Sequence, residues 1–215
     1  MTARPRRTPR QARSRRLVDR LLDAAAELFA ERGYAATTTN HIAERAGVSV
    51  GSLYQFFPGK AALLSALQGL WTERLRRALD TALQDASERP IAEVIDDVLH
   101  VHMTLNADPP GLLGLLLLTP SATGEQETVR AAVQGRLEDI LARRAPGLGG
   151  GERSAVARMS IHIANGLYAL GGAQGVTDPA VRAQVRAALL AYLGPVVGPT
   201  GRERKVDPQR PAAVP

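Results

Sequence analysis

The chain has 215 residues, 45% of them hydrophobic, which is enough for one or two domains with a buried core and excludes disorder of the whole chain. It has no cysteine, so disulfides and thiolate metal sites are excluded, and its longest apolar run, residues 111–118, is too short to span a bilayer. The formal net charge of +6 resides entirely in residues 1–60, where 11 Lys and Arg stand against 5 Asp and Glu.

The basic amino-terminal end predicts contact with a polyanion, although a basic arm without a partner is an alternative. Residues 1–12 combine two prolines with several arginines and predict a flexible arm. No secretory signal is recognisable at this end, so we expect a cytoplasmic protein. From Ser14, a predicted N-cap, apolar residues recur at helical spacing until Gly33 ends the first helix.

Two short helices are predicted next. Thr38 is positioned to cap a helix over residues 39–46, and Ser49 to cap a third helix. Gly47 ends the first of the pair and permits a sharp turn, so the two helices form a helix-turn-helix. Because Leu53 of the third helix points back to the core, its neighbours are free to face outward and enter a major groove.

The spacing of these motifs resembles the amino-terminal DNA-binding domain of the tetracycline-repressor (TetR) family over residues 15–67, in the segments LFAERGY, IAERAGVS, GSLYQFF and PGKAALL. The resemblance implies an all-helical homodimer whose carboxy-terminal domain binds a small molecule and thereby releases operator DNA. The chain departs from the family at Asn40 and Val50, where many members carry a basic side chain.

The candidate DNA contacts come from the arm and the helix-turn-helix. Tyr54 follows Leu53 and points away from the core, where its phenol can donate to a phosphate, in agreement with the resemblance. Lys60 lies at the start of a fourth helix, where free N–H groups favour an anion, so we expect a phosphate clamp rather than a solvated lysine. The full candidate set is Arg13, Arg15, Thr38, Thr39, Asn40, Ser49, Val50, Gly51, Ser52, Tyr54, Gln55 and Lys60.

After residue 60 the sequence becomes neutral and leucine-rich without a linker, so the fourth helix is predicted to belong to both domains. We expect an all-α fold in which residues 13–60 form the helix-turn-helix domain and residues 61–193 a ligand-binding and dimerisation domain. Residues 194–215 read as a disordered tail. Helices are predicted over 58–87, from Pro90 to a break at 108–111, and over 121–144, 153–173 and 179–193.

A ligand pocket beside the fourth helix is predicted to control DNA binding, because a tilt of that helix would change the spacing of the two recognition helices. The candidate lining is mainly apolar, which predicts a hydrophobic or amphipathic ligand. A single histidine on an apolar face can also be a satisfied core residue. The candidate residues are Leu67, Trp71, His102, Leu105, Leu116, His162 and Asn165.

The last two helices are predicted to form a four-helix dimer interface with their symmetry mates. Both carry apolar stripes, and small residues such as Gly166 permit close approach. The alternative is that both helices only close the core of the monomer. The candidate interface residues are Met159, Ile163, Leu167, Leu170, Val181, Val185, Leu189 and Tyr192.

Catalysis is not predicted. His100 and His102 lie about 200° apart on a helix and cannot chelate one metal, and no nucleophile or phosphate-loop motif is present. We therefore expect no metal and no cofactor. The sequence predicts a ligand-responsive repressor that binds a near-palindromic operator as a dimer, with a ligand-independent architectural DNA-binding protein as the alternative.

Overall fold

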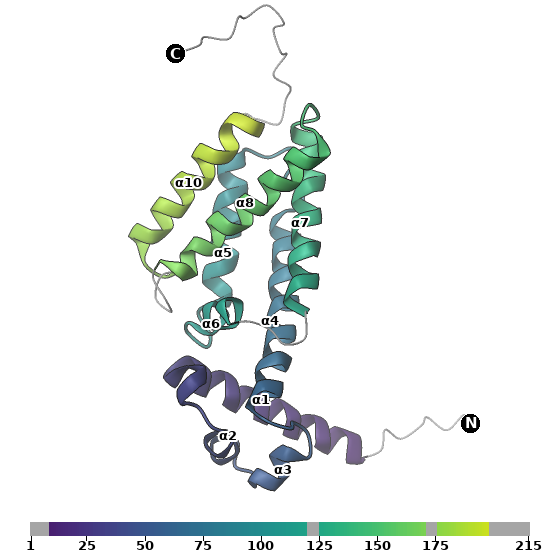
Figure 1. The fold of residues 1–215 in the computed structure, drawn as a ribbon, viewed down its shortest axis with the longest axis vertical. Coiled ribbons are helices and arrows are strands. Elements are labelled where there is room, and N and C mark those ends of the chain that lie inside the picture. Colours follow the sequence, from purple (N-terminus) through teal and green to yellow (C-terminus); the bar gives the residue numbers. More distant parts are fainter. Residues whose placement is uncertain (1–8, 120–124, 171–175, 198–215) are drawn as a thin grey trace, which may run out of the picture.

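The computed structural model describes residues 9–119, 125–170 and 176–197, and over these ranges the regular secondary structure is entirely helical (Figure 1). The all-α prediction is confirmed. None of the described helices combines the length and the apolarity that crossing a bilayer requires. The helices are α1 (Pro9–Ala36), α2 (Thr39–Arg45), α3 (Val50–Tyr54), α4 (Lys60–Ala82), α5 (Ile91–Leu105), α6 (Leu112–Leu118), α7 (Glu125–Arg144), α8 (Gly150–Ala169) and α10 (Pro179–Val197).

The first helix begins earlier than predicted. It starts at Pro9, so Ser14 lies inside α1 and does not cap it, and the predicted flexible arm loses its last four positions to the helix. Proline suits a first helical turn, because its fixed φ is already helical and its missing N–H would have no partner there. Residues 1–8 lie outside the described part of the chain. At the other end, Gly33 interrupts the helix at φ 78°, as predicted.

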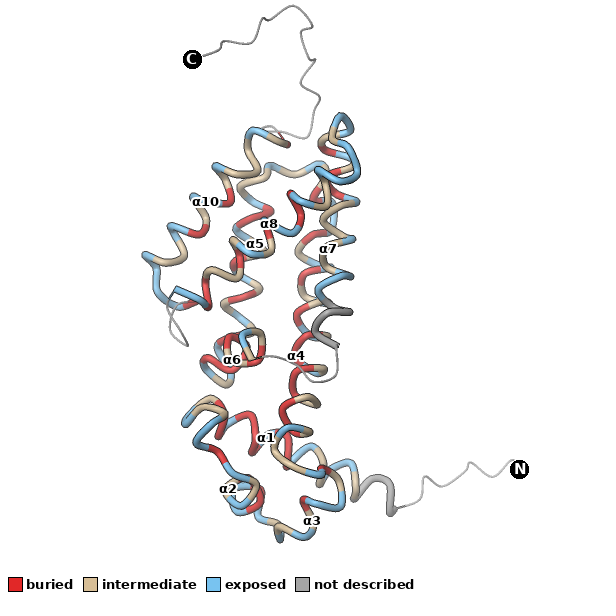
Figure 2. Tube along the Cα trace, viewed as in Figure 1, coloured by how far each residue is buried: buried red, intermediate tan, exposed pale blue. Residues whose placement is uncertain are grey.

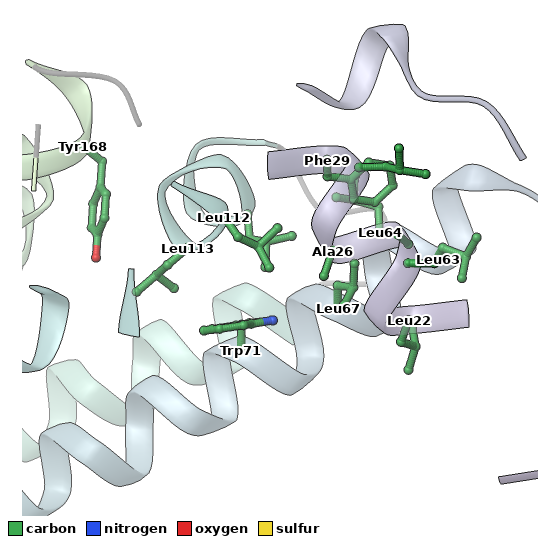
Figure 3. Packing of buried hydrophobic residues seen from close by; sticks show 14 of the residues in the cluster. Leu22, Ala26, Phe29, Leu63, Leu64, Leu67, Trp71, Leu112, Leu113 and Tyr168 are labelled. Carbon is green, nitrogen blue, oxygen red and sulfur yellow. The ribbon is translucent and has the colours of Figure 1, made fainter. Parts of the chain in front are cut away.

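The fourth helix joins the two halves of the molecule (Figure 1). Leu63, Leu64 and Leu67 are buried in the same apolar cluster as Phe29 of α1, while the second half of α4 packs against α5 and α7. Figure 3 shows how Leu67 approaches α1, with Trp71 one turn further along beneath α6. One continuous core therefore connects the amino-terminal helices to the carboxy-terminal domain.

The short helix α6 lies between α1 and the upper helices (Figure 1). It forms from the leucine run after the predicted break, where Gly111 adopts φ 80°. Leu112 and Leu113 are fully buried in the shared core. Gln68 of α4 also ties the end of α6 down, because its Nε2 donates to the carbonyl oxygens of Leu116 at 3.2 Å and Thr119 at 2.9 Å.

Some predicted boundaries in the second half are wrong. Helix α4 ends at Ala82 rather than residue 87, because the chain turns there and Asp85 has a positive φ of 54°. Helix α8 begins at Gly150 rather than residue 153, since Glu152 accepts a hydrogen bond from the Gly149 amide at 3.1 Å and supports the first turn. The predicted start of α7 at 121 and end of α8 at 173 lie outside the described residues.

The last helix continues beyond the predicted start of the tail at residue 194. It includes Pro195 and ends at Val197, which is buried in a cluster with Leu141, Val156 and Ala157. The burial of Val197 stabilises a last turn that local propensity disfavours. Residues 198–215 lie outside the described part of the chain.

Candidate DNA interface and ligand cavity

The two predicted caps of the helix-turn-helix are both present. The Thr38 hydroxyl accepts a hydrogen bond from the His41 amide at 3.2 Å, and the Ser49 hydroxyl accepts one from the Ser52 amide at 3.1 Å. Between the two helices Gly47 adopts φ 64°, a left-handed conformation that glycine tolerates best. The turn therefore forms where the sequence predicted it.

Two arginines fix the pair of helices to α1, and sequence reasoning missed both. Arg20 of α1 donates from Nη2 to the carbonyl oxygen of Ala46 and to that of Gly47 at 3.4 Å, so a cation lies at the end of α2. Arg45 of α2 pairs with Glu27 at 2.9 Å and Glu31 at 2.8 Å. Such exposed pairs contribute little stability individually, but they set the position of α2 on α1.

Two of the predicted DNA contacts, Thr39 and Tyr54, lie next to each other across α2 and α3. Tyr54 is 52% exposed, and its hydroxyl lies 3.3 Å from that of Thr39, which links α3 to α2 on the outer face. Val50 departs from the prediction, because it is half-buried and packs against the core. The Arg13 side chain lies outside the described part of the chain. Exposed candidates are Arg15, Thr38, Asn40, Ser49, Gly51, Tyr54 and Gln55, while Thr39, Ser52 and Lys60 are half-buried.

Lys60 has partners within the chain. Its ammonium donates to the carbonyl oxygens of Tyr34 at 2.7 Å and Ala35 at 3.2 Å, and Nζ lies 4.3 Å from the centroid of the Tyr34 ring. The side chain thus fastens the start of α4 to the end of α1. An ammonium has three N–H donors, so these two hydrogen bonds leave one donor.

The carboxy-terminal domain contains a partly open cavity of about 150 Å³, lined by residues of α4, α5, α6, α7, α8 and α10. Its wall is mainly leucine, isoleucine and valine. Of the seven predicted lining residues, only His102 and Asn165 lie on this wall. The sequence placed the cavity too close to the amino-terminal domain, because apolar residues that fill a core and those that line a cavity follow the same helical spacing.

The other five predicted pocket residues have different environments. Leu67 and Trp71 are buried at the junction of α1, α4 and α6 and border a separate surface hollow. Leu105 and Leu116 pack in the apolar core. His162 is exposed on the outer side of α8, so it points away from the cavity.

His102 is a buried member of the cavity wall. Its Nδ1 lies 2.7 Å from the Tyr168 hydroxyl, with which it shares a hydrogen bond. Burial lowers the pKa of His102 to about 4 and raises the pKa of Tyr168, so both groups are neutral at physiological pH. The alternative that His102 is a satisfied core histidine therefore holds, although its ring also borders the cavity.

The predicted dimer residues fall into three groups by burial. Leu167, Val185 and Leu189 are buried inside the single chain and are not available to a second subunit. For these three residues the structure agrees with the alternative that the helices close the core of the monomer. Met159 and Leu170 are 48% and 73% exposed. The remaining members, which are half-buried, are Ile163, Val181 and Tyr192.

The turn between two capped helices, held against α1 and followed by a helical domain with an internal cavity, defines the class of helix-turn-helix regulators. Two family models match this arrangement along the chain. The model for bacterial regulatory proteins of the tetR family matches residues 21–67, and the model for the tetracyclin repressor-like C-terminal domain matches residues 90–193. The chain belongs to the TetR family.

Similar proteins agree with this assignment. The HTH-type transcriptional repressor KstR2 of Mycolicibacterium smegmatis is 42% identical over 79 residues, which cover 35% of this chain and 38% of that protein. KstR2 of Rhodococcus jostii is 37% identical over 101 residues, covering 38% of this chain and 50% of the relative. The chain thus spans half or less of the length of these two relatives.

One solved structure matches nearly over its whole length. It is a TetR-family transcriptional regulator from Streptomyces coelicolor, with 26% sequence identity and a TM-score of 0.61. The match covers 84% of this chain and 99% of that chain. The likeness therefore extends through the carboxy-terminal domain as well as the helix-turn-helix.

We predict that Lys60→Ala weakens binding to all DNA sequences about equally and lowers the slope of log affinity against log salt by about 0.9 per subunit, hence roughly 2 for a dimer. Losing the hydrogen bonds to α1 should also reduce the free energy of unfolding by roughly 1–2 kcal/mol. Arg77→Ala is the control, because Arg77 is an exposed cation further along α4. An unchanged salt slope in Lys60→Ala would mean that Lys60 holds α4 to α1 but does not contact a phosphate.

We predict that His102 contributes to the pH dependence of stability. Between pH 6.5 and about 4 the unfolded chain binds a proton that the buried histidine does not, so the contribution is complete above pH 6.5 and is lost as the pH falls. The loss at pH 5 is roughly 2 kcal/mol. Urea unfolding at pH 7.5 and pH 5 should show a smaller drop for His102→Gln than for the wild type. His162→Gln, at an exposed position, should keep the wild-type drop; equal drops in all three proteins would contradict the assignment.

Proposed function

We propose that the protein is a ligand-responsive transcriptional repressor that binds a near-palindromic operator as a homodimer. The observation that carries the proposal is the course of α4. Its first half is buried in the core under the helix-turn-helix, and its second half contributes Thr72, Leu75 and Leu79 to the cavity wall. A ligand that moves α4 must therefore also move the helices that meet DNA. The names of the repressor relatives support the sign of the regulation.

The proposed mechanism is a change of spacing. In a dimer the two recognition helices must lie about 34–36 Å apart to enter successive major grooves. Each copy of α3 is held to α1 and α4 through Leu53 and the neighbouring buried residues, so it follows their motion as part of one packed unit. A small tilt of α4 is amplified over its length and breaks this register. Because a bacterial operator lies in the cytoplasm, the protein would act there.

The proposed DNA contacts follow the exposed side of the helix-turn-helix. Gly51 and Tyr54 on α3, Gln55 at its C-cap and Asn40 on α2 are exposed and are placed for base edges or phosphates. Arg15 adds an exposed cation on α1 for the phosphate backbone. The third N–H of Lys60 completes the proposed phosphate contacts at the start of α4.

The dimer interface is proposed on the outer faces of α8 and α10. Figure 2 shows exposed positions along the outer edge of α10. Small exposed residues recur there at helical spacing, and α8 adds exposed Met159 and Leu170 beside them. Such a surface permits close helix packing between two copies. The exposed small residues at this spacing are Ala180, Ala183, Ala187 and Ala191, and Ala188 beside them is exposed as well.

We predict that Ala187→Glu produces a folded monomer with weak operator binding, because it places an unpaired charge at the centre of this outer face. Sedimentation velocity measures the oligomeric state, and circular dichroism measures folding. Ala132→Glu, at an exposed position of α7, is the matched control and should remain dimeric. Leu189→Arg should unfold the chain instead, since Leu189 is buried. A dimeric Ala187→Glu protein would place the interface elsewhere.

The experiment that tests the function begins with selection of bound sequences from random DNA, which supplies the operator. Small molecules are then screened for release of that operator, and any active one is titrated into free protein and into the operator complex by calorimetry. Linkage requires that the operator weakens ligand binding by the same factor by which the ligand weakens operator binding, typically 5–150-fold. Equal affinities in the two titrations, or tight operator binding that no ligand affects, would favour the architectural alternative.

A further inference from the structure

One polar group on the cavity wall lacks the partners that its chemistry demands. Arg144, the last residue of α7, is only 6% exposed and borders the cavity. Its Nη2 donates to the carbonyl oxygen of Arg89, but its Nε and Nη1 are buried without a hydrogen-bond partner. A guanidinium carries five N–H donors and keeps its charge in proteins, so this cation is incompletely satisfied.

The other buried polar groups on the same wall are satisfied within the chain. Thr72 donates to the Gln68 carbonyl at 2.5 Å, Ser160 donates to the Val156 carbonyl at 2.8 Å, and His102 shares its hydrogen bond with Tyr168. Arg144 also has no ion pair among the described residues. An uncompensated buried charge is costly, and an anion that enters the cavity would remove that cost by drawing the guanidinium toward it, since Nε and Nη1 have almost no accessible surface in the empty site.

The size and charge of the cavity restrict the anion. A volume of about 150 Å³ matches that of an apolar cavity known to accept a benzene ring, so the interior holds a short apolar group, and the open side leaves room for the end of a longer chain. Of the two arginines that line the cavity, Arg130 is exposed and screened by water, so the buried charge is that of Arg144 and balances one negative charge. A doubly charged phosphate ester would leave an excess charge in an apolar site, whereas a carboxylate matches Arg144 one to one and accepts charge-assisted hydrogen bonds.

We propose that the cavity binds a small amphipathic carboxylate whose acid group pairs with the Arg144 guanidinium and whose apolar tail lies between α4, α5 and α8. This inference rests on the proposed function, because it names the chemical class of the effector. The acid group lies at the α7 end of the cavity. The tail points toward the α4 residues Leu75 and Thr72, so a chain longer than the cavity pushes on the helix shared by both domains.

The test compares straight-chain carboxylates of six to twelve carbons with primary amides of the same length, which differ in charge but hardly in shape. Calorimetry measures affinity for the full chain. For the best chain length, we expect the wild type to bind the carboxylate about tenfold or more tightly than the amide, as a charge-assisted hydrogen bond provides. A wild type that binds the two equally overturns the proposal without any variant.

Three variants locate the site. In Arg144→Met the preference for the carboxylate should fall to less than about twofold while the amide still binds. Arg144→Lys retains the charge and should retain a reduced preference. Arg143→Met, at the exposed neighbouring position on α7, should behave as the wild type. A carboxylate preference that survives in Arg144→Met contradicts the assignment.

The operator experiment separates this proposal from the proposed function. A carboxylate that binds through Arg144 but leaves the operator complex intact supports the site and counts against ligand-controlled repression. Release of the operator by neutral molecules alone, with no carboxylate preference, supports the repressor and overturns the Arg144 site.

Discussion

The structure depends on α4 being one uninterrupted helix whose two halves are both packed into the core. Its amino-terminal half supplies Leu63 and Leu64 to the core under the helix-turn-helix, and its carboxy-terminal half is packed between α5 and α7. Close-packed interiors transmit displacements because they have little free volume. The amino-terminal helices therefore cannot change their angle to the rest of the chain unless α4, or α6, which also packs on α1, moves or its packing breaks.

An empty cavity in such a packed interior destabilises the folded state in two ways. The apolar wall loses dispersion contacts across the empty space, and the buried Arg144 loses hydration without gaining an acid partner. Both penalties disappear when the cavity is filled by a ligand with an apolar part and a negative charge. Ligand binding is then favoured by the instability of the empty site as well as by new contacts.

The sequence predicts those features of the structure that depend on neighbouring residues. The caps at Thr38 and Ser49 and the turn at Gly47 depend on neighbours within a few residues, so they could be read directly. The contacts of Arg20 and Arg45 with other helices could not, because exposed cations on a polar helix face look alike in sequence. The late end of α10 was missed because the burial of Val197 depends on residues that are distant in the sequence.

The cavity and the dimer surface could not be located from the sequence, because both depend on how distant helices pack. Leu189 and Ala187 are two residues apart on α10, yet one is buried in the cavity wall and the other is exposed. Hydrophobic periodicity shows that Leu189 is buried, but it does not show whether it is buried within the chain or against a second subunit. Only the packing of α10 against α5 and α8 shows that Leu189 is buried within the chain and that the alanine face is exposed.

A second connection between the cavity and the DNA-binding end runs through α6. Tyr168 shares a hydrogen bond with His102 on the cavity wall, and its ring lies so close to Gly114 of α6 that an added Cβ would be 2.8 Å from Cδ1. Any ligand that displaces His102 must either break this hydrogen bond or move the Tyr168 ring against α6. Because α6 packs directly on α1, that displacement reaches the helix-turn-helix without passing through α4. The two routes meet at Gln68, which joins α4 to the carbonyl groups at the end of α6, so α4 and α6 are constrained to move together.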